Sequence, residues 1–264
     1  MTAAAHTSAF RRPIIAANWK MHKTAQEAVS YGQKLLAGIS GVTGVEVVVC
    51  PPFTALAALG PVLSGSDVAL GAQNVHWEAA GAYTGEISAA MLVDAGCRYV
   101  IIGHSERRAM GETDEQVACK VKAAAAAGLT PIVCVGERIE DRRAGRTEEL
   151  VTAQVRAALA GVAPEIAAKI VVAYEPVWAI GTGEHASPAE AGRVIGLIRS
   201  AVEATCGTHA ASCVRIQYGG SVNAENIGGF LAEPEIDGAL VGSASLDAGS
   251  FARIVRRAQE VKGS

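Results

Sequence analysis

The 264-residue chain has few aromatic residues, a small net charge and no long apolar run. Phe, Trp and Tyr make up 5% of the residues, and the net charge is −3 with a pI of about 6.1. The small negative net charge argues against nucleic acid or an anionic membrane as the main partner. No run is long and apolar enough to span a bilayer, so we expect no membrane partner.

The cysteines form no CxxC pair and no disulfide framework. They are Cys50, Cys97, Cys119, Cys134, Cys206 and Cys213. Several lie inside apolar runs such as VEVVVC and PIVCVG, which is typical of reduced thiols in a cytoplasmic protein. The first twelve residues, MTAAAHTSAFRR, lack the apolar segment of a signal peptide. We therefore predict a disordered tail over residues 1–12 and a cytoplasmic location.

The remaining chain alternates between short β-branched runs and helical patterns that begin at capping residues and end at Gly. Eight runs are predicted strands: 13–18, 45–50, 67–73, 99–104, 130–136, 169–175, 214–219 and 237–242. A predicted helix follows each of them. Eight such units in about 250 residues predict an α/β protein with a single (β/α)8 barrel, the TIM barrel, as a catalytic domain over residues 13–264.

The predicted strands are continuous apolar runs, as a parallel sheet buried on both faces requires. A doubly wound open sheet is the alternative, but it usually has a Gly-rich first turn, and AANWKMHKT is no such turn. The charged stretch ERIEDRRAGRTEE, residues 137–149, is interpreted as a solvated loop and helix start, with a functional charge patch as the alternative.

Polar residues follow five of the predicted strands at their C-terminal ends, where barrels of this kind carry their reacting groups. They include Asn18, Lys20, His104, Glu106, Glu175, Ser221 and Ser243. Taken alone, Lys20 could be a solvated lysine and His104 a structural histidine. Glu175 is harder to explain in this way, because a carboxylate that ends an apolar strand is costly to bury unpaired. Convergence of five strands on one rim favours a shared site.

The glycines at this rim indicate an anion site. Gly219, Gly220 and Gly242 would expose backbone N–H groups, and the loops after strands seven and eight are the usual phosphate site of these barrels. We therefore expect a small phosphorylated substrate, with the Ser221 hydroxyl as a further donor.

The polar rim residues suit proton transfer next to a carbonyl. Glu175 is the candidate general base, and a neutral His104 can donate a hydrogen bond to the oxygen on which charge develops. His104 precedes SERR, a predicted helix start whose positive end favours neutral imidazole. Lys20 adds a positive charge and Asn18 a neutral donor. The apolar residues 177–180, between Pro176 and the sequence Gly-Thr-Gly at 181–183, would close over the ligand and exclude water.

Motifs along nearly the whole chain, from about residue 13 to 261, resemble the triosephosphate isomerase family. They are ANWKM (17–21), GAQN (71–74), GAYTGEIS (81–88), GHSERR (103–108), PIVCVGE (131–137), AYEPVWAIGTG (173–183), YGGSV (218–222) and LVGSASL (240–246). The resemblance implies interconversion of dihydroxyacetone phosphate and D-glyceraldehyde 3-phosphate through an enediolate, in glycolysis and gluconeogenesis, without a cofactor or metal.

The resemblance also implies individual roles. Glu175 would be the base, His104 the electrophile and Lys20 the electrostatic residue. The implied substrate contacts are Asn18, Lys20, Gly181, Ser221, Gly242 and Ser243. Glu106 would lie near Lys20 and His104. A homodimer is implied, in which Thr84 on the GAYTGEIS loop approaches the partner's site; without the resemblance, this segment would be interpreted as a solvent-exposed loop.

One position departs from the family pattern, which usually has Gly-Gly where this chain has Gly242-Ser243. Serine still supplies a backbone N–H, provided that Ser243 avoids a conformation open only to glycine. The rival interpretations are another phosphate-binding barrel enzyme, which would need different strand-end chemistry, and a non-catalytic barrel that binds a phosphorylated ligand. The non-catalytic barrel would be expected to have lost the base or the electrophile.

Overall fold

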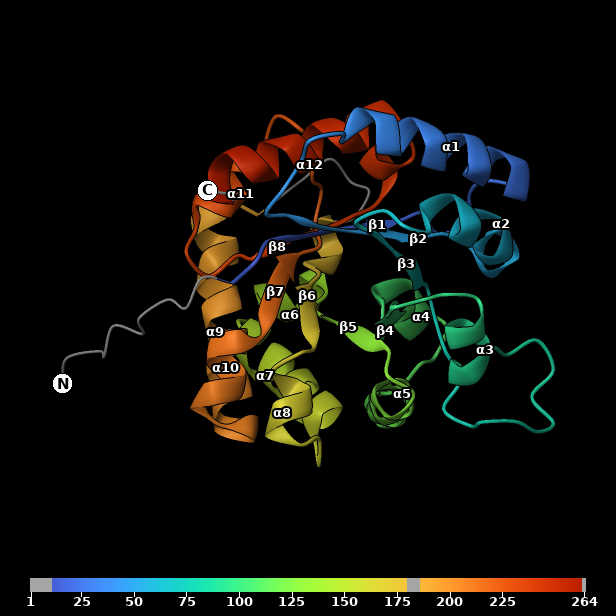
Figure 1. The fold of residues 1–264 in the computed structure, drawn as a ribbon. Helices are drawn as coiled ribbons and strands as arrows, with labels where there is room; N and C mark the ends of the chain where they lie inside the picture. The colour runs from blue at the N-terminus through green and yellow to red at the C-terminus, as the bar shows by residue number, and fades with distance from the viewer. Residues whose placement is uncertain (1–10, 180–185, 263–264) are drawn as a thin grey trace.

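Eight parallel strands close into a barrel in the computed structural model, which describes residues 11–179 and 186–262 (Figure 1). Each strand pairs with the next along the chain, and β1 pairs with β8. The strands are β1 (Ile14–Asn18), β2 (Glu46–Cys50), β3 (Val68–Ala72), β4 (Tyr99–Ile102), β5 (Thr130–Val135), β6 (Val171–Tyr174), β7 (Arg215–Tyr218) and β8 (Gly238–Val241). The predicted (β/α)8 fold is confirmed.

Helices surround the barrel (Figure 1). Those in the described residues are α1 (Ala25–Gly38), α2 (Phe53–Leu63), α3 (Ala89–Asp94), α4 (Ser105–Ala109), α5 (Asp114–Ala126), α6 (Ile139–Arg143), α7 (Thr147–Leu159), α8 (Pro164–Ala167), α9 (Pro188–Cys206), α10 (Thr208–Cys213), α11 (Ile227–Ala232) and α12 (Ala248–Lys262), with 3-10 turns η1 (Val177–Ala179) and η2 (Ser243–Ser245). Capping boxes begin α1 and α5. The sequence patterns did not predict α8 and α10, because four to six residues are too few to show helical periodicity.

Alternation along each strand divides the core into two parts. Ile14 and Ala16 of β1 point into the barrel, whereas Ile15 and Ala17 belong to the larger core between strands and helices. Both sets are fully buried. This double burial explains why the strands are continuous apolar runs in the sequence.

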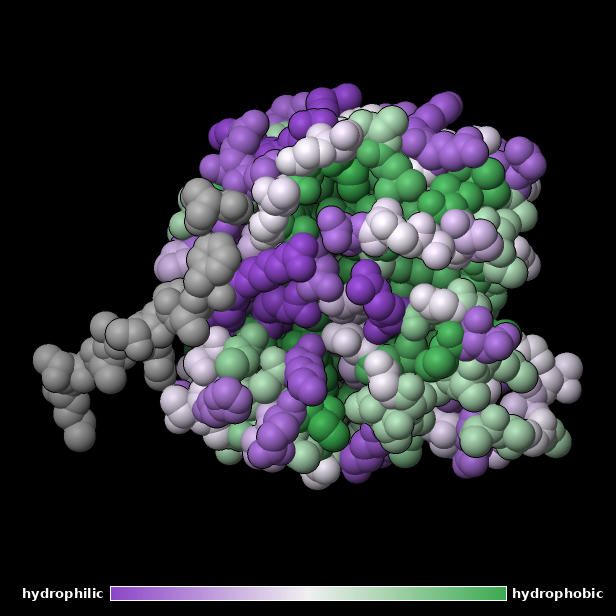
Figure 2. All heavy atoms as spheres, in the orientation of Figure 1, coloured by the Kyte–Doolittle hydropathy of each residue, from purple (hydrophilic) through white to green (hydrophobic). Residues whose placement is uncertain are grey.

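The chain contacts the barrel before β1 begins. Arg11 Nε donates to Asp237 Oδ1 at 2.7 Å, and an Arg12 guanidinium nitrogen donates to the Val45 carbonyl at 2.9 Å. Both arginines were assigned to the predicted tail; residues 1–10 of that tail lie outside the described residues. In Figure 2, hydrophilic residues gather over the region where β7 and β8 lie in Figure 1.

The six cysteines are free thiols, of which Cys119 is exposed and Cys213 is partly exposed. No helix in residues 11–179 and 186–262 has the length and apolarity needed to cross a membrane. The same residues contain no group of three or more His, Cys, Asp or Glu side chains placed to hold a metal ion.

Candidate active site

The C-terminal ends of the strands surround a cavity of about 430 Å³. Seven of the predicted site residues line it: Asn18, Lys20, His104, Glu175, Ser221, Gly242 and Ser243. They come from the loops after β1, β4, β6, β7 and β8, which are far apart in sequence. Gly181, the remaining predicted contact, and the rest of residues 180–185 lie outside the described residues.

Glu175 follows β6 directly and is 2% exposed. Its Oε1 lies 2.9 Å from His104 Nε2, and its Oε2 accepts the Ser105 N–H at 2.9 Å. Burial raises the pKa of this carboxyl, but His104, the Ser105 N–H and Lys20 outweigh burial and lower it below its ordinary value. The carboxylate form of Glu175 is therefore stabilised at neutral pH, as a general base requires.

His104 is the N-cap of α4, and its ring nitrogen Nδ1 accepts the Glu106 N–H at 3.2 Å. An Nδ1 that accepts a hydrogen bond carries no proton, so this contact assigns the proton of a neutral ring to Nε2. Burial lowers the pKa of His104, whereas the adjacent Glu175 carboxylate raises it, and the net direction is upward. Separation of the Glu175 carboxylate from Nε2 would remove the larger upward influences on the pKa of His104. Burial and Lys20, which lower this pKa and favour neutral imidazole, would then be opposed only by the smaller upward influence of Glu106.

Lys20 has a left-handed backbone conformation, with φ of 52°. This region is uncommon for a residue with a side chain, and such strain persists where neighbouring contacts impose it. The Lys20 N–H donates to Asn18 Oδ1 at 3.1 Å, and Gln73 Nε2 donates to the Lys20 carbonyl at 2.9 Å. The ammonium group pairs with Glu106 Oε1 at 2.8 Å. Neighbouring loops thus hold the lysine at the rim.

Gly136 allows the backbone of Glu175 to approach β5. A Cβ at Gly136 would lie 1.7 Å from the Glu175 carbonyl oxygen, a distance that no real contact permits. The Glu175 N–H also donates to the Val135 carbonyl. The position of the candidate base therefore requires glycine directly after the neighbouring strand.

Glu137 holds the segment after the base. Its Oε1 accepts hydrogen bonds from Tyr174 at 3.1 Å and Trp178 Nε1 at 3.0 Å, and its carbonyl accepts the Val177 N–H. Burial raises the pKa of this fully buried carboxyl. The Arg142 guanidinium lies over the Trp178 ring, 4.2 Å from its centroid. Stretch 137–149 was interpreted as a solvated loop and helix start. In the structure it contains α6, and α7 begins at Thr147, while Glu137 and Arg142 contact Trp178.

Sequence reasoning missed the roles of Gln73 and Glu137. Both residues belong to motifs that resemble the family, GAQN and PIVCVGE. Gln73 ends the predicted strand 67–73 and Glu137 directly follows the predicted strand 130–136, but neither was selected as a site residue. The signal that could have identified Glu137 is a carboxylate directly after an apolar strand, the same signal that identified Glu175.

The loops after β7 and β8 present backbone donors to the cavity. The N–H groups of Gly220, Ser221 and Val222 have no acceptor among the described residues. The Ser221 hydroxyl, which we expected to face the ligand, donates to the Ala179 carbonyl at 2.8 Å. Ser243 is not among the residues with positive φ, so its backbone avoids the conformation that favours glycine.

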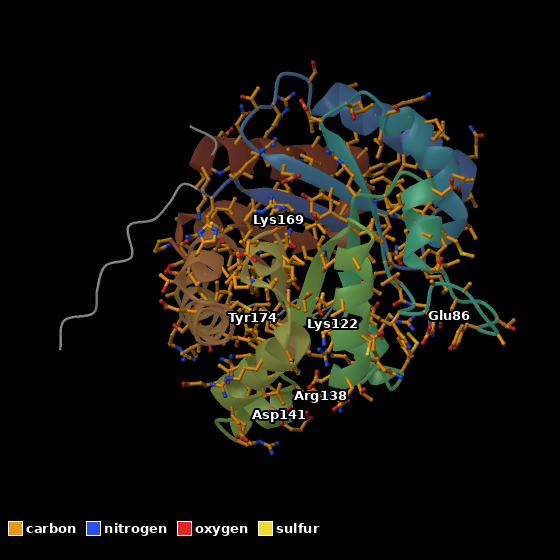
Figure 3. The ribbon with its side chains drawn as sticks, turned by 60° about the horizontal axis from the view of Figure 1, so that its bottom comes forward. Glu86, Lys122, Arg138, Asp141, Lys169 and Tyr174 are labelled. Atoms are coloured by element: carbon orange, nitrogen blue, oxygen red, sulfur yellow. The ribbon has the colours of Figure 1, made fainter. Side chains whose placement is uncertain are left out.

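Glu106 and Thr84 lie outside the cavity lining. Glu106 contacts the Lys20 ammonium, and its Oε2 is 3.6 Å from His104 Nδ1. Thr84 is exposed on the loop that includes Glu86, which projects away from the barrel (Figure 3).

Comparisons with known proteins agree on one family. A family model described as triosephosphate isomerase matches residues 13–258. The triosephosphate isomerase of Moorella thermoacetica is 57% identical over 246 residues, covering 93% of this chain and 98% of that protein. Those of Chloroflexus aurantiacus and Symbiobacterium thermophilum are 56% and 54% identical, covering 93% and 96% of this chain and 98% and 99% of the relatives.

Proposed function

The chain belongs to the triosephosphate isomerase family, whose reaction interconverts dihydroxyacetone phosphate and D-glyceraldehyde 3-phosphate in glycolysis, and we propose that Glu175, His104 and Lys20 perform this reaction here. The observation that carries the proposal is one cavity lined by a buried carboxylate, an imidazole within 2.9 Å of it and a rim lysine. The free thiols agree with the proposed cytoplasmic location.

In the proposed mechanism, the Glu175 carboxylate removes a proton from the carbon next to the substrate carbonyl. The electron pair of that C–H bond forms the C=C bond of an enediolate, and negative charge develops on the carbonyl oxygen. His104 donates its Nε2–H to this oxygen, and Lys20 stabilises the charge. Glu175 then returns the proton to the former carbonyl carbon. The former carbonyl oxygen keeps the proton from His104, and the hydroxyl of the first carbon gives its proton to His104 as it becomes the new carbonyl, so the isomerisation is complete without net loss of a proton.

The substrate phosphate is proposed to bind the loops after β7 and β8. The available donors are the N–H groups of residues 220–222, with Gly242 and Ser243 on the facing loop. Successive N–H groups in a loop form a concave anion site without a charged side chain. Asn18, at the end of β1 and next to β8 in the closed barrel, is proposed to contact the reacting part of the substrate.

Deuterium exchange tests the proton-transfer mechanism. In D2O, the purified protein should convert D-glyceraldehyde 3-phosphate and place deuterium on the carbon next to the carbonyl, because a carboxylate exchanges its proton with solvent before returning it. NMR of the product measures the label. Conversion with no label at any exposure time would indicate hydride transfer and contradict the role of Glu175. Competitive binding of inorganic phosphate without conversion would support the non-catalytic alternative.

We propose that the chain forms a homodimer through the face around α3. Met91 on α3 is 56% exposed and Tyr83 on the loop before it 43% exposed, and both line one shallow hollow. Met21 after β1 and Met110 after α4 are 93% and 77% exposed. Large exposed apolar side chains of this kind are typical of protein interfaces. The projecting loop with Tyr83 and Thr84 would insert against the partner (Figure 3).

The dimer is tested by a charge at its proposed centre. Tyr83→Lys should raise the dimer dissociation constant at least about 30-fold, because interface tyrosines often contribute 2 kcal/mol or more. Ile166→Lys is the matched control, since Ile166 is 41% exposed on α8, on another side of the barrel (Figure 1). Sedimentation velocity should give a mass near twice 27.0 kDa for the wild type and the control. If Tyr83→Lys and Ile166→Lys have the same dimer dissociation constant, the interface lies elsewhere.

A further inference from the structure

The loop between β7 and α11 contains an asparagine whose side-chain contacts connect its two halves. Asn226 Nδ2 donates to the Ser221 carbonyl at 3.0 Å, and Asn226 Oδ1 accepts the Asn223 N–H at 2.9 Å. In return, Asn223 Oδ1 accepts the Asn226 N–H at 2.8 Å. We propose that Asn226 is a positioning residue that holds the 219–223 loop in the shape that binds the substrate phosphate.

The polarity of the two backbone partners makes asparagine specific at this position. The carbonyl of Ser221 can only accept a hydrogen bond, and the N–H of Asn223 can only donate one. A single side-chain amide satisfies both, since it carries one NH2 group and one oxygen. Aspartate has the same shape but no donor for the Ser221 carbonyl, and alanine makes neither contact.

The Ser221 contact determines the orientation of a peptide group at the cavity. In a planar trans peptide, the carbonyl of Ser221 and the N–H of Val222 point in opposite directions. Because Asn226 holds the carbonyl, the N–H is directed away from Asn226. Val222 lines the cavity, and its N–H has no acceptor among the described residues. Loss of the Asn226 contact would free this peptide to rotate.

Proton transfer next to the substrate carbonyl should be largely independent of Asn226. Asn226 does not line the cavity and has no contact with Glu175, His104 or Lys20 in the described residues. Its effect should therefore appear in phosphate binding rather than in proton transfer. The inference rests on the proposed phosphate site, so the experiment must separate failure of that site from failure of the role of Asn226.

The experiment compares Asn226→Asp and Asn226→Ala with the wild type. Loss of one or two hydrogen bonds that order the loop should raise KM for D-glyceraldehyde 3-phosphate about ten-fold, with a similar rise in the competitive inhibition constant of inorganic phosphate. The fall in kcat should stay within about three-fold, because these hydrogen bonds lie outside the reacting groups. Glu225→Gln is the matched control, since Glu225 precedes Asn226 and its exposed carboxylate makes no hydrogen bond or ion pair with another described residue; its backbone N–H, which the substitution keeps, donates to Asn223 Oδ1.

The outcomes separate the alternatives. Unchanged KM and phosphate inhibition in both Asn226 variants would overturn the positioning role. A fall in kcat and in melting temperature at unchanged KM would also overturn it, because that result indicates a merely structural residue. If phosphate does not inhibit the wild type competitively, the proposed phosphate site itself is wrong. A ten-fold rise in KM and in the phosphate inhibition constant of Asn226→Asp supports the role of the amide donor, provided that both constants are unchanged in Glu225→Gln.

Discussion

Glu175→Gln is expected to reduce kcat by about 10²- to 10⁴-fold, the usual contribution of a positioned general base. Glutamine keeps the shape of the side chain and an oxygen for the Ser105 N–H, but its amide does not accept a proton from carbon at neutral pH. KM should change much less than kcat, because the phosphate loops are untouched. A coupled assay with D-glyceraldehyde 3-phosphate measures both constants.

The matched control for this variant is Glu165→Gln, an exposed carboxylate on α8. It should keep wild-type kinetics, since it is remote in the fold from the cavity lining. A decrease in kcat of less than ten-fold in Glu175→Gln would exclude Glu175 as the base. The next candidate would then be Glu106, a carboxylate that contacts Lys20 and lies near His104.

The second large effect is expected for Asp237→Ala, which should lower the free energy of unfolding by about 3–5 kcal/mol. Asp237 is 2% exposed and lies directly before β8. Its Oδ2 accepts hydrogen bonds from Arg199 and from the Ile216 N–H, each at 2.8 Å. Removal of the carboxylate leaves the largely buried Arg199 guanidinium without its buried counter-ion.

Arg199 also provides the control. Its Nε pairs with Glu235 Oε2 at 2.6 Å, but the Glu235 side chain is 38% exposed. Solvent screens that pair, so Glu235→Ala should cost at most about 1 kcal/mol. Urea unfolding at one fixed protein concentration measures both variants, since the stability of an oligomer depends on concentration. An equal loss of unfolding free energy in Asp237→Ala and Glu235→Ala would show that burial does not control the strength of these ion pairs.

Much of the site could be predicted because barrel topology converts sequence position into spatial position. Once eight apolar strands are recognised, the residue after each strand must lie on one rim. Asn18, His104, Glu175, Ser221 and Ser243 were placed in this way, and all of them line the cavity. The family resemblance added the chemistry, which the pattern of strands alone left open.

Contacts between loops could not be predicted in the same way. Gln73 reaches the Lys20 carbonyl, and Glu137 reaches Trp178, across distances in sequence of 53 and 41 residues. The local pattern marks Glu137 only as a carboxylate after an apolar strand, and it does not indicate which residue either side chain contacts. The left-handed backbone of Lys20 is likewise a result of surrounding contacts, since lysine has no intrinsic preference for that region.

The sequence by itself determined the eight-unit barrel, the apolar strands and the rim on which the reacting groups lie. A strand buried on both faces is a continuous apolar run, and chain order fixes which end of each strand faces the rim. Only the tertiary structure decided how these groups are held: the Glu175–His104 pair, the glycine at 136 that admits the base, and the Asn226 contacts across the 219–223 loop. These features depend on distances of a few ångströms between separate loops, which sequence periodicity does not encode.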